Sequence, residues 1–340
     1  MEEERTSSRQ PLPLYAPFLQ STNRFPSTMS FPLLRLPHLA LEEIVKSLSH
    51  REVLFLSQTS LRARRQISNP TKSHSITTRI VDDRLDSCVE IFCPYQLFYR
   101  IKIDNYRREP SNSSWRFKTP VPVYYEKDNL ISHWTKNDTG VHDILDFLNE
   151  IFRIKQVSFE INLGNSDSGV KFLEYCVSKN LKIGLVQWNS FIPNDETNER
   201  ILMASKSALN LKIRGYNSKN SLHFDNFHLF RMDWIEIKYS AWMTVENIVD
   251  LRNCKRVKLG EVLLNAEDIN KVLRGFMENP GEMQELQMDC CNKIKLEEVV
   301  EGLHFNRQND REMYWLTSNN GIRFSVSMML WSTVVIARES

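Results

Sequence analysis

The sequence has little glycine and no long apolar run, and both shortages exclude whole classes of protein. Only 10 of its 340 residues are Gly, which argues against the Gly-rich loops that hold nucleotide phosphates. No apolar stretch reaches the roughly 18 residues that a membrane-spanning helix needs. The most apolar segment, residues 328–336, is interrupted by Ser332 and Thr333 and predicts a single buried strand. The acidic start Met1–Arg5 is unlike a secretory signal, so we expect an intracellular protein of the cytoplasm or nucleus, with no membrane partner.

Cysteine is also scarce. The 6 Cys, two of them adjacent at Cys290 and Cys291, do not form the framework of a disulfide-rich secreted protein. Cys88 and Cys93 have no second pair at zinc-finger spacing, and the His residues show no paired metal-ligand spacing. Core Cys and surface His are the better interpretation, so we expect no metal and no cofactor.

Charge is nearly balanced, with 44 basic and 42 acidic side chains and a formal net charge of +2. This balance argues against a general electrostatic grip on nucleic acid or an anionic membrane. The basic run Arg62, Arg64 and Arg65 could touch nucleic acid, but it is more typical of the C-terminal end of a solvated helix. We therefore expect no nucleic-acid partner.

Catalytic motifs are missing as well. The polar segment Gly164–Gly169 lacks the Lys and the spacing of a phosphate loop, and no G-x-S-x-G nucleophile elbow occurs. An enzymatic alternative would need polar residues that converge in a pocket, such as Asp225, His228 and Asp233 near one strand edge. We expect a non-catalytic protein with no catalytic residues.

The length suggests about two domains. Residues 1–29, rich in Pro and polar side chains, predict a disordered tail. Residues 30–70 predict three short helices: Pro37 suits a first helical turn, and Ser49 with Glu52 forms a capping-box pattern. So small a bundle is at the lower limit of independent stability. Its apolar surface exceeds what it can bury internally, so this segment needs a partner.

Residues 71–138 predict a connecting α/β region, in which Pro120 and Pro122 would confine any strand to a sheet edge. An amphipathic helix is predicted from Val141, and short alternating strands followed by amphipathic helices then recur. The remaining boundaries are residues 139–328 for this array and 329–340 for a C-terminal segment.

The recurring strands have the spacing of a repeat. The strand centres Ile235, Val257 and Leu286 lie 22 and 29 residues apart, within the range of leucine-rich-repeat units, although the L-x-x-L-x-L-x-x-N signature is absent. Asn320-Gly321 favours a tight hairpin that would cap the array. We predict a mixed α/β fold in which a three-helix module precedes a degenerate leucine-rich-repeat-like strand–helix array.

Residues 31–67 resemble the F-box, a short helical module. The matching positions are Leu36-Pro37, Leu39, Leu41, Ile44-Val45, Leu48-Ser49, Glu52-Val53-Leu54, Leu56-Ser57-Gln58-Thr59-Ser60 and Arg62–Arg65. The rest of the chain is similar to the F-box-associated domain of nematode F-box proteins, most recognisably at residues 209–273. The resemblance implies a non-catalytic substrate-recognition subunit of a ubiquitin ligase. Its F-box would dock a Skp-type adaptor that bridges to a cullin–RING ligase, while residues 139–328 would hold a protein substrate.

The resemblance and the apolar pattern together give a candidate adaptor-binding set. Its members are Leu36, Pro37, Leu39, Leu41, Ile44, Leu48, Val53 and Leu56. Trp242, in a loop between a strand and its helix, is the candidate substrate contact. The alternative is a protein-binding module that keeps an F-box without ligase activity in vivo.

Overall fold

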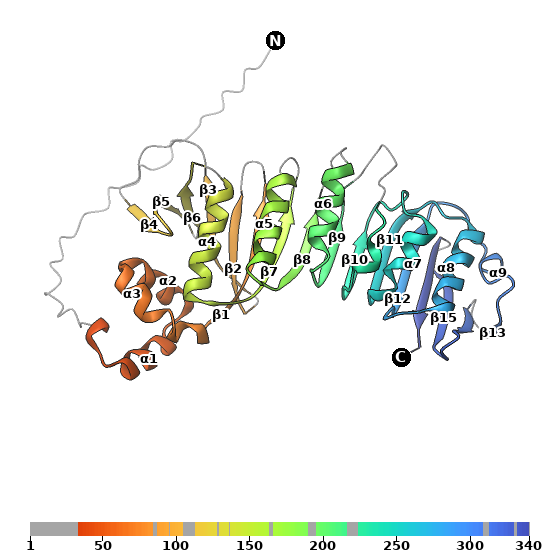
Figure 1. Ribbon diagram of the computed structural model, residues 1–340, viewed down its shortest axis with the longest axis horizontal. Helices are drawn as coiled ribbons and strands as arrows, with labels where there is room; N and C mark the ends of the chain where they lie inside the picture. Colours follow the sequence, from red (N-terminus) through yellow and green to blue (C-terminus); the bar gives the residue numbers. More distant parts are fainter. Residues whose placement is uncertain are drawn as a thin grey trace, which may run out of the picture.

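The described part of the chain begins with helices and continues as one long sheet (Figure 1). The computed structural model describes residues 33–83, 87–94, 96–104, 113–127, 129–135, 137–162, 166–189, 195–215, 224–308, 313–329 and 332–339. The tail predicted at residues 1–29 lies outside this part of the chain. None of the described helices is long and apolar enough to cross a membrane.

The N-terminal helices form a helical module, residues 33–73. Its elements are η1 (Leu33–Arg35), α1 (His38–Ser47), α2 (His50–Thr59), α3 (Leu61–Ile67) and η2 (Pro70–Ser73). The predicted capping box is confirmed, since the Ser49 hydroxyl accepts from the Glu52 N–H while the Glu52 carboxylate accepts from the Ser49 N–H at 2.7 Å. Ser60 caps α3 in the same way by accepting from the Ala63 N–H. Each such cap is worth about 1 kcal/mol, so local sequence sets where these helices begin.

Sixteen strands of the described chain form a single sheet, which extends from β13 at one end to β4 at the other. They are β1 (Ser75–Asp82), β2 (Cys88–Cys93), β3 (Gln96–Asp104), β4 (Ser113–Arg116), β5 (Pro120–Glu126), β6 (Asn129–His133), β7 (Arg153–Ile161), β8 (Ile183–Trp188), β9 (Asn210–Ile213), β10 (Trp234–Ile237), β11 (Arg256–Val262), β12 (Glu285–Cys290), β13 (Phe305–Gln308), β14 (Met313–Thr317), β15 (Arg323–Met329) and β16 (Thr333–Arg338). Their order is β13-β14-β15-β16-β12-β11-β10-β9-β8-β7-β1-β2-β3-β6-β5-β4. The elongated molecule follows this order from end to end (Figure 1).

The centre of the sheet is parallel and carries the strand–helix repeat. Strand β1 and strands β7 to β12 pair in parallel with one another. The segments between strands form α4 (Asn137–Ile151), α5 (Ser166–Ser178), α6 (Asp195–Ser205), η3 (Phe227–Leu229), α7 (Val245–Asp250), η4 (Leu251–Asn253), α8 (Ala266–Glu278) and α9 (Leu296–Val299). The α-helices cover one face of the sheet (Figure 1). The predicted mixed α/β class, with helices preceding a strand array, is confirmed.

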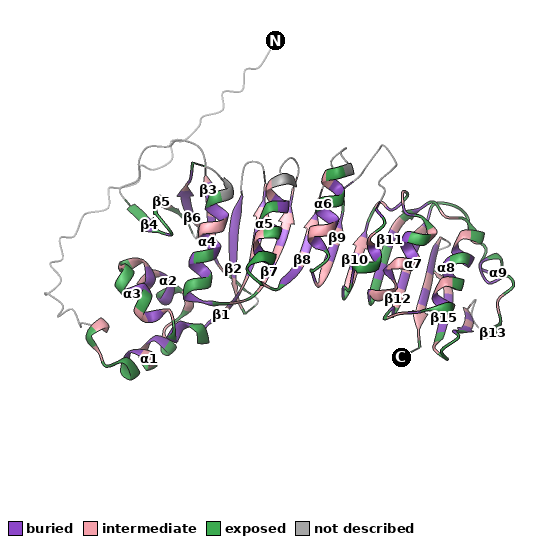
Figure 2. Ribbon diagram, in the orientation of Figure 1, coloured by how far each residue is buried: buried purple, intermediate pink, exposed green. Residues whose placement is uncertain are grey.

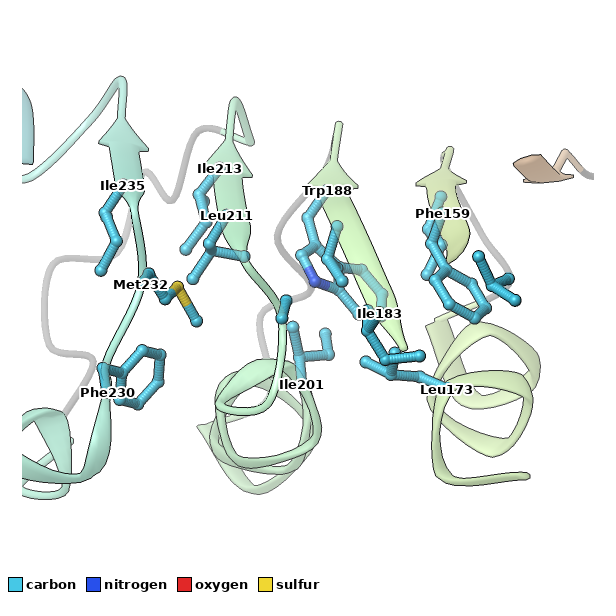
Figure 3. Close-up of a cluster of buried hydrophobic side chains, with 14 of the residues drawn as sticks. Phe159, Leu173, Ile183, Trp188, Ile201, Leu211, Ile213, Phe230, Met232 and Ile235 are labelled. Carbon is cyan, nitrogen blue, oxygen red and sulfur yellow. The ribbon is translucent and has the colours of Figure 1, made fainter. Parts of the chain in front are cut away.

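The core is the layer between the sheet and these helices. Alternate strand side chains such as Phe159 and Ile235 point towards the layer of helices, from which Leu173 and Ile201 point back (Figure 3). Trp188 is 1% exposed, and its indole N–H donates to the Ser205 hydroxyl at 3.2 Å. The described helices turn their exposed sides away from the sheet (Figure 2). Period-two alternation thus leaves the opposite side of the sheet as a polar, helix-free face.

The prolines of β5 do not place this strand at an edge, as the sequence predicted. β5 lies between β4 and β6. Its pairing with β6 begins only at Val123, whereas Pro120 and Pro122 pair with β4 alone. A proline is tolerated at these two positions because β5 has a paired strand on one side only there, so its missing N–H need not bond a second strand. The prediction was wrong for the strand as a whole, although each proline occupies a locally one-sided position.

The C-terminal region also departs from the prediction. The hairpin between β14 and β15 is confirmed, with Gly321 at φ +82° in its turn. Residues 328–336 are not one strand, because Met329 ends β15 and Thr333 begins β16, which pairs back antiparallel. β16 lies between β15 and β12. The segment 329–340 therefore contributes β16 to the sheet.

Two further differences concern the middle of the chain. The connecting region 71–138 supplies β1 to β6, which belong to the same sheet as the array. Helix α6 was not predicted, because its apolar side is short: Ile201 and Leu202 are its fully buried apolar side chains. So short a stripe gives a weak periodic signal.

Candidate functional site

The helical module carries an apolar strip that faces solvent. Leu39 is 76% exposed, and Pro37 beside it is exposed too. Leu36, Ile44 and Leu48 are half-buried. We call these five residues the exposed strip. A large apolar side chain left in water in this way is typical of a protein-interaction surface.

The other three predicted adaptor residues are Leu41, Val53 and Leu56. Leu41 is 4% exposed and Val53 is fully buried, so both belong to the core. Leu56 is partly buried against the same core, as Leu36 and Leu48 are. The surface available to a partner is therefore narrower than the predicted set of eight. Helical spacing shows which residues share a face, but it does not show which residues of that face turn inward.

Arg64 anchors the helical module to the sheet. Its guanidinium is almost fully buried and donates to the backbone carbonyls of Phe117, at 3.1 Å, and Arg116. It also lies 4.7 Å from the Phe147 ring centroid and 3.7 Å from a Glu150 carboxylate oxygen. Burial lowers the pKa of Arg64, and the nearby Glu150 carboxylate opposes that shift. Because Arg64 is buried, the run of three arginines does not form one exposed basic patch.

A second junction joins the module to β1 and β2 around a cavity of about 420 Å³. A His74 ring nitrogen lies 2.8 Å from the Leu48 carbonyl oxygen. The Cys93 sulfur lies 3.2 Å from the Nε2 atom of His50, whose ring is 5.0 Å from that of His74. Burial, together with His74, lowers the pKa of His50, and burial raises the pKa of Cys93. The His50 imidazole and the Cys93 thiol are therefore both neutral at this junction.

No metal-binding cluster is found here or elsewhere in the described residues. Within them, no group of three or more His, Cys, Asp or Glu side chains is placed to hold an ion. Of the predicted Cys pair, Cys88 is buried and Cys93 contacts His50. Burial raises the pKa of Cys88 to about 12, so this thiol is protonated and suits a core position.

Trp242, the candidate substrate contact, is used largely for packing. Its indole N–H donates to the Tyr239 carbonyl oxygen at 3.1 Å, and its ring stacks on Phe227 at 6.0 Å. The side chain is half-buried. It therefore fixes the loop between β10 and α7 and leaves only part of its ring to a ligand.

The residues of the enzymatic alternative are all exposed. Asp233 forms an ion pair with Lys255 at 2.7 Å, and the His228 ring is 3.3 Å from the backbone carbonyl of Asp225. These contacts do not converge on a pocket. In the polar segment Gly164–Gly169, α5 begins at Ser166, and the residues just before it are outside the described chain.

The helix-free face carries ordered charges that the sequence patterns did not single out. Glu90, 2% exposed at its side chain, is held between Arg79 and Arg100 on the neighbouring strands β1 and β3. Lys212 and Glu236 pair at 2.7 Å across β9 and β10. In the sequence, the signal that could have located these charges was the polar residue at every second position of each strand. Strand order was needed to show which charges are neighbours.

Comparison with known proteins gives a sequence that is similar over most of the chain. No known protein-family profile matches the chain. The chain is 22% identical over 288 residues to the Skn-1 dependent zygotic transcript 15 protein of Caenorhabditis elegans. The alignment covers 81% of this chain and 83% of that protein. The chain is thus similar to a nematode protein along most of its length.

Proposed function

We propose that this chain is the substrate-recognition subunit of a Skp–cullin–F-box ubiquitin ligase. The helical module docks a Skp-type adaptor, and the sheet with its helices holds a protein substrate. The adaptor connects the chain to a cullin–RING ligase, whose other subunits transfer ubiquitin. This role requires no catalytic residue in the chain.

The observation that carries the proposal is the exposed strip of the helical module. Leu39 is the most exposed large apolar side chain of the described residues, at 76%. It lies in the segment that resembles an F-box, between the Leu36-Pro37 pair and the capping box of Ser49 and Glu52. Burying this strip against an adaptor would remove its apolar surface from water, which drives association.

The anchoring of the module supports the second half of the proposal. Arg64 bonds the backbone at the end of β4, and His74, directly before β1, bonds Leu48 of the module. A substrate on the sheet is therefore carried at a defined position relative to the adaptor. An extended array of this kind also offers a long surface for a protein ligand.

A charge placed in the exposed strip tests adaptor docking. Leu39→Asp should reduce capture of a purified Skp-type adaptor at least about tenfold, because a buried unpaired carboxylate at an interface centre is costly. Leu263→Asp is the matched control, since Leu263 is 57% exposed but follows β11, away from the module. Circular dichroism should show both variants folded. Equal adaptor capture by Leu39→Asp and the wild type would contradict the proposal.

A second experiment separates the proposal from the alternative without ligase activity. The wild-type chain and adaptor are mixed with a purified cullin–RING complex, and co-purification is measured. Recovery of cullin with the chain is expected for a ligase subunit. Recovery of adaptor alone would favour a protein-binding module that does not join a ligase.

A further inference from the structure

The first residues of β3 have a strand neighbour on one side only among the described residues. Gln96, Leu97 and Tyr99 pair with β2. The pairing with β6 begins one residue later, at Arg100 with Asn129. The backbone groups on that side of residues 96–99 therefore form an open edge, and such edges pair readily with an added extended segment.

A cavity of about 210 Å³ lies at this open edge. Its lining residues are Arg51, Leu97, Phe98, Tyr99, Arg100 and Asn129. Four of them are consecutive in β3 and one is the first residue of β6, so the cavity occupies the notch where β6 begins. Leu97 is 47% exposed there. Phe98 is the extra residue of an irregularity in the β2–β3 pairing, and such bulges redirect side chains and often adjoin functional sites.

The buried hydroxyl of Tyr99 is a second and independent sign of a ligand. Tyr99 is 4% exposed, and within the described chain its hydroxyl has no hydrogen-bond partner. A buried hydroxyl without a partner costs roughly 1–3 kcal/mol, so an acceptor brought by a ligand would relieve that cost. Burial raises the pKa of Tyr99, and the positive charge of Arg51 works against that rise. Arg51 and Tyr99 both line the same cavity.

We propose that the open edge of β3, with Arg51 and Tyr99, binds an extended acidic peptide segment of another protein. The segment adds to β3 as a strand through main-chain hydrogen bonds, an established mode of peptide recognition. Its acidic side chain faces the Arg51 guanidinium and accepts from the Tyr99 hydroxyl. Leu97 supplies an apolar contact beside them. This site goes beyond the proposed ligase role and does not depend on it.

Charge and chemistry favour an acidic occupant. The described contact of the Arg51 guanidinium is with the Phe55 ring, at 5.8 Å, which leaves its donors available for a carboxylate. Arg100 already pairs with Glu90, so Arg51 is the main cation of the site. The Tyr99 hydroxyl adds a donor that a basic or purely apolar segment would leave unused.

Binding is tested with the full chain and the fluorescein-labelled peptide Gly-Thr-Val-Glu-Val-Glu-Val-Thr, by fluorescence polarisation. The same peptide with Lys in place of Glu should bind at least roughly fivefold more weakly, as should a backbone N-methylated version. Slower hydrogen exchange at the Leu97 to Tyr99 amides on peptide binding should locate the site. Failure of the acidic peptide to bind, or equal binding of the Lys peptide, overturns the proposal.

Two variants test the residues, and one serves as a control. Arg51→Glu should weaken peptide binding roughly fivefold or more. Tyr99→Phe should weaken it about threefold while the fold stays intact, because the substitution removes an unpaired buried hydroxyl. Arg62→Glu reverses an exposed charge of the same module and should leave binding unchanged. Unchanged binding by both Arg51→Glu and Tyr99→Phe overturns the assignment.

The test also separates this site from adaptor docking and from self-association. Leu39→Asp should lose the adaptor and keep the acidic peptide, so the two proposals fail independently. A chain that dimerises through the open edge and ignores the peptide would show that a second copy is the occupant. Sedimentation of the wild type and Arg51→Glu detects that outcome, which also overturns the proposal.

Discussion

At the residue scale, Arg64 shows how one buried cation joins two parts of the chain. It lies in α3 and reaches the carbonyl oxygens of residues 116 and 117, at the end of β4 and just beyond it. The sequence places Arg64 in a basic helix end, where a solvated side chain is the usual outcome. Its burial depends on β4 and α4, which are more than 50 residues away in the chain.

Replacing Arg64 by Met should destabilise the protein by about 3 kcal/mol. Met preserves much of the apolar volume but leaves the carbonyls of Arg116 and Phe117 without their donors. The free energy of unfolding is measured by urea titration. Arg65→Met, at an exposed position of the same helix, should change it by less than about 0.5 kcal/mol. Equal stability of the two variants would contradict the anchoring role of Arg64.

At the scale of elements, a glycine lets the backbones of two neighbouring parallel strands approach closely. Gly260 of β11 lies directly against the backbone carbonyl of Lys238, which follows β10. Its own carbonyl accepts from both the N–H and the hydroxyl of Ser240, at 2.9 and 2.7 Å. A side chain at residue 260 would collide with backbone that these hydrogen bonds hold in place.

Gly260→Ala should therefore cost about 2 kcal/mol of stability, as overpacking against fixed backbone does. The control is Gly184→Ala in β8, where the added carbon meets the Gln156 side chain from its Cγ outward. That side chain can rotate away, so the loss should stay below about 1 kcal/mol. Thermal unfolding followed by circular dichroism compares the two. A larger loss of stability for Gly184→Ala than for Gly260→Ala would show that the clash with backbone does not determine the loss.

Elements differ in how far local sequence predicts them. The capping boxes at Ser49, Thr244 and Asn265 are all formed, because each depends on residues within three positions of one another. The position of β5 was mispredicted, because it depends on where β6 begins to pair. The exposed strip was only partly predictable, since Leu41 and Leu39 differ in burial according to what packs on α1.

At the scale of the whole molecule, β16 joins the C-terminal hairpin to the parallel array. It pairs antiparallel with β12 on one side and with β15 on the other. Ile336, 1% exposed, points into the core, whereas the adjacent Val335 is half-buried on the helix-free face. The strand therefore closes the end of the core next to β12 and links the remaining antiparallel strands to it.

Ile336→Asp should destabilise the chain by more than about 4 kcal/mol and reduce its soluble yield, because it buries an unpaired carboxylate. Val335→Asp, on the other face of the same strand, should cost only about 1 kcal/mol. Soluble fraction after expression and urea unfolding measure both effects. Similar losses for the two variants would mean that β16 does not present Ile336 to the core.

The helix caps, the alternating strands and the amphipathic helices could be predicted from the sequence alone, because each depends on residues only a few positions apart. These local patterns were enough to predict a helical module followed by a strand–helix array. The tertiary structure was needed to show that residues 71–138 join the same sheet, that β16 inserts beside β12, and that Arg64 is buried. It was also needed to find the open edge of β3. These features depend on contacts between segments that are distant in the chain, and local periodicity does not predict such contacts.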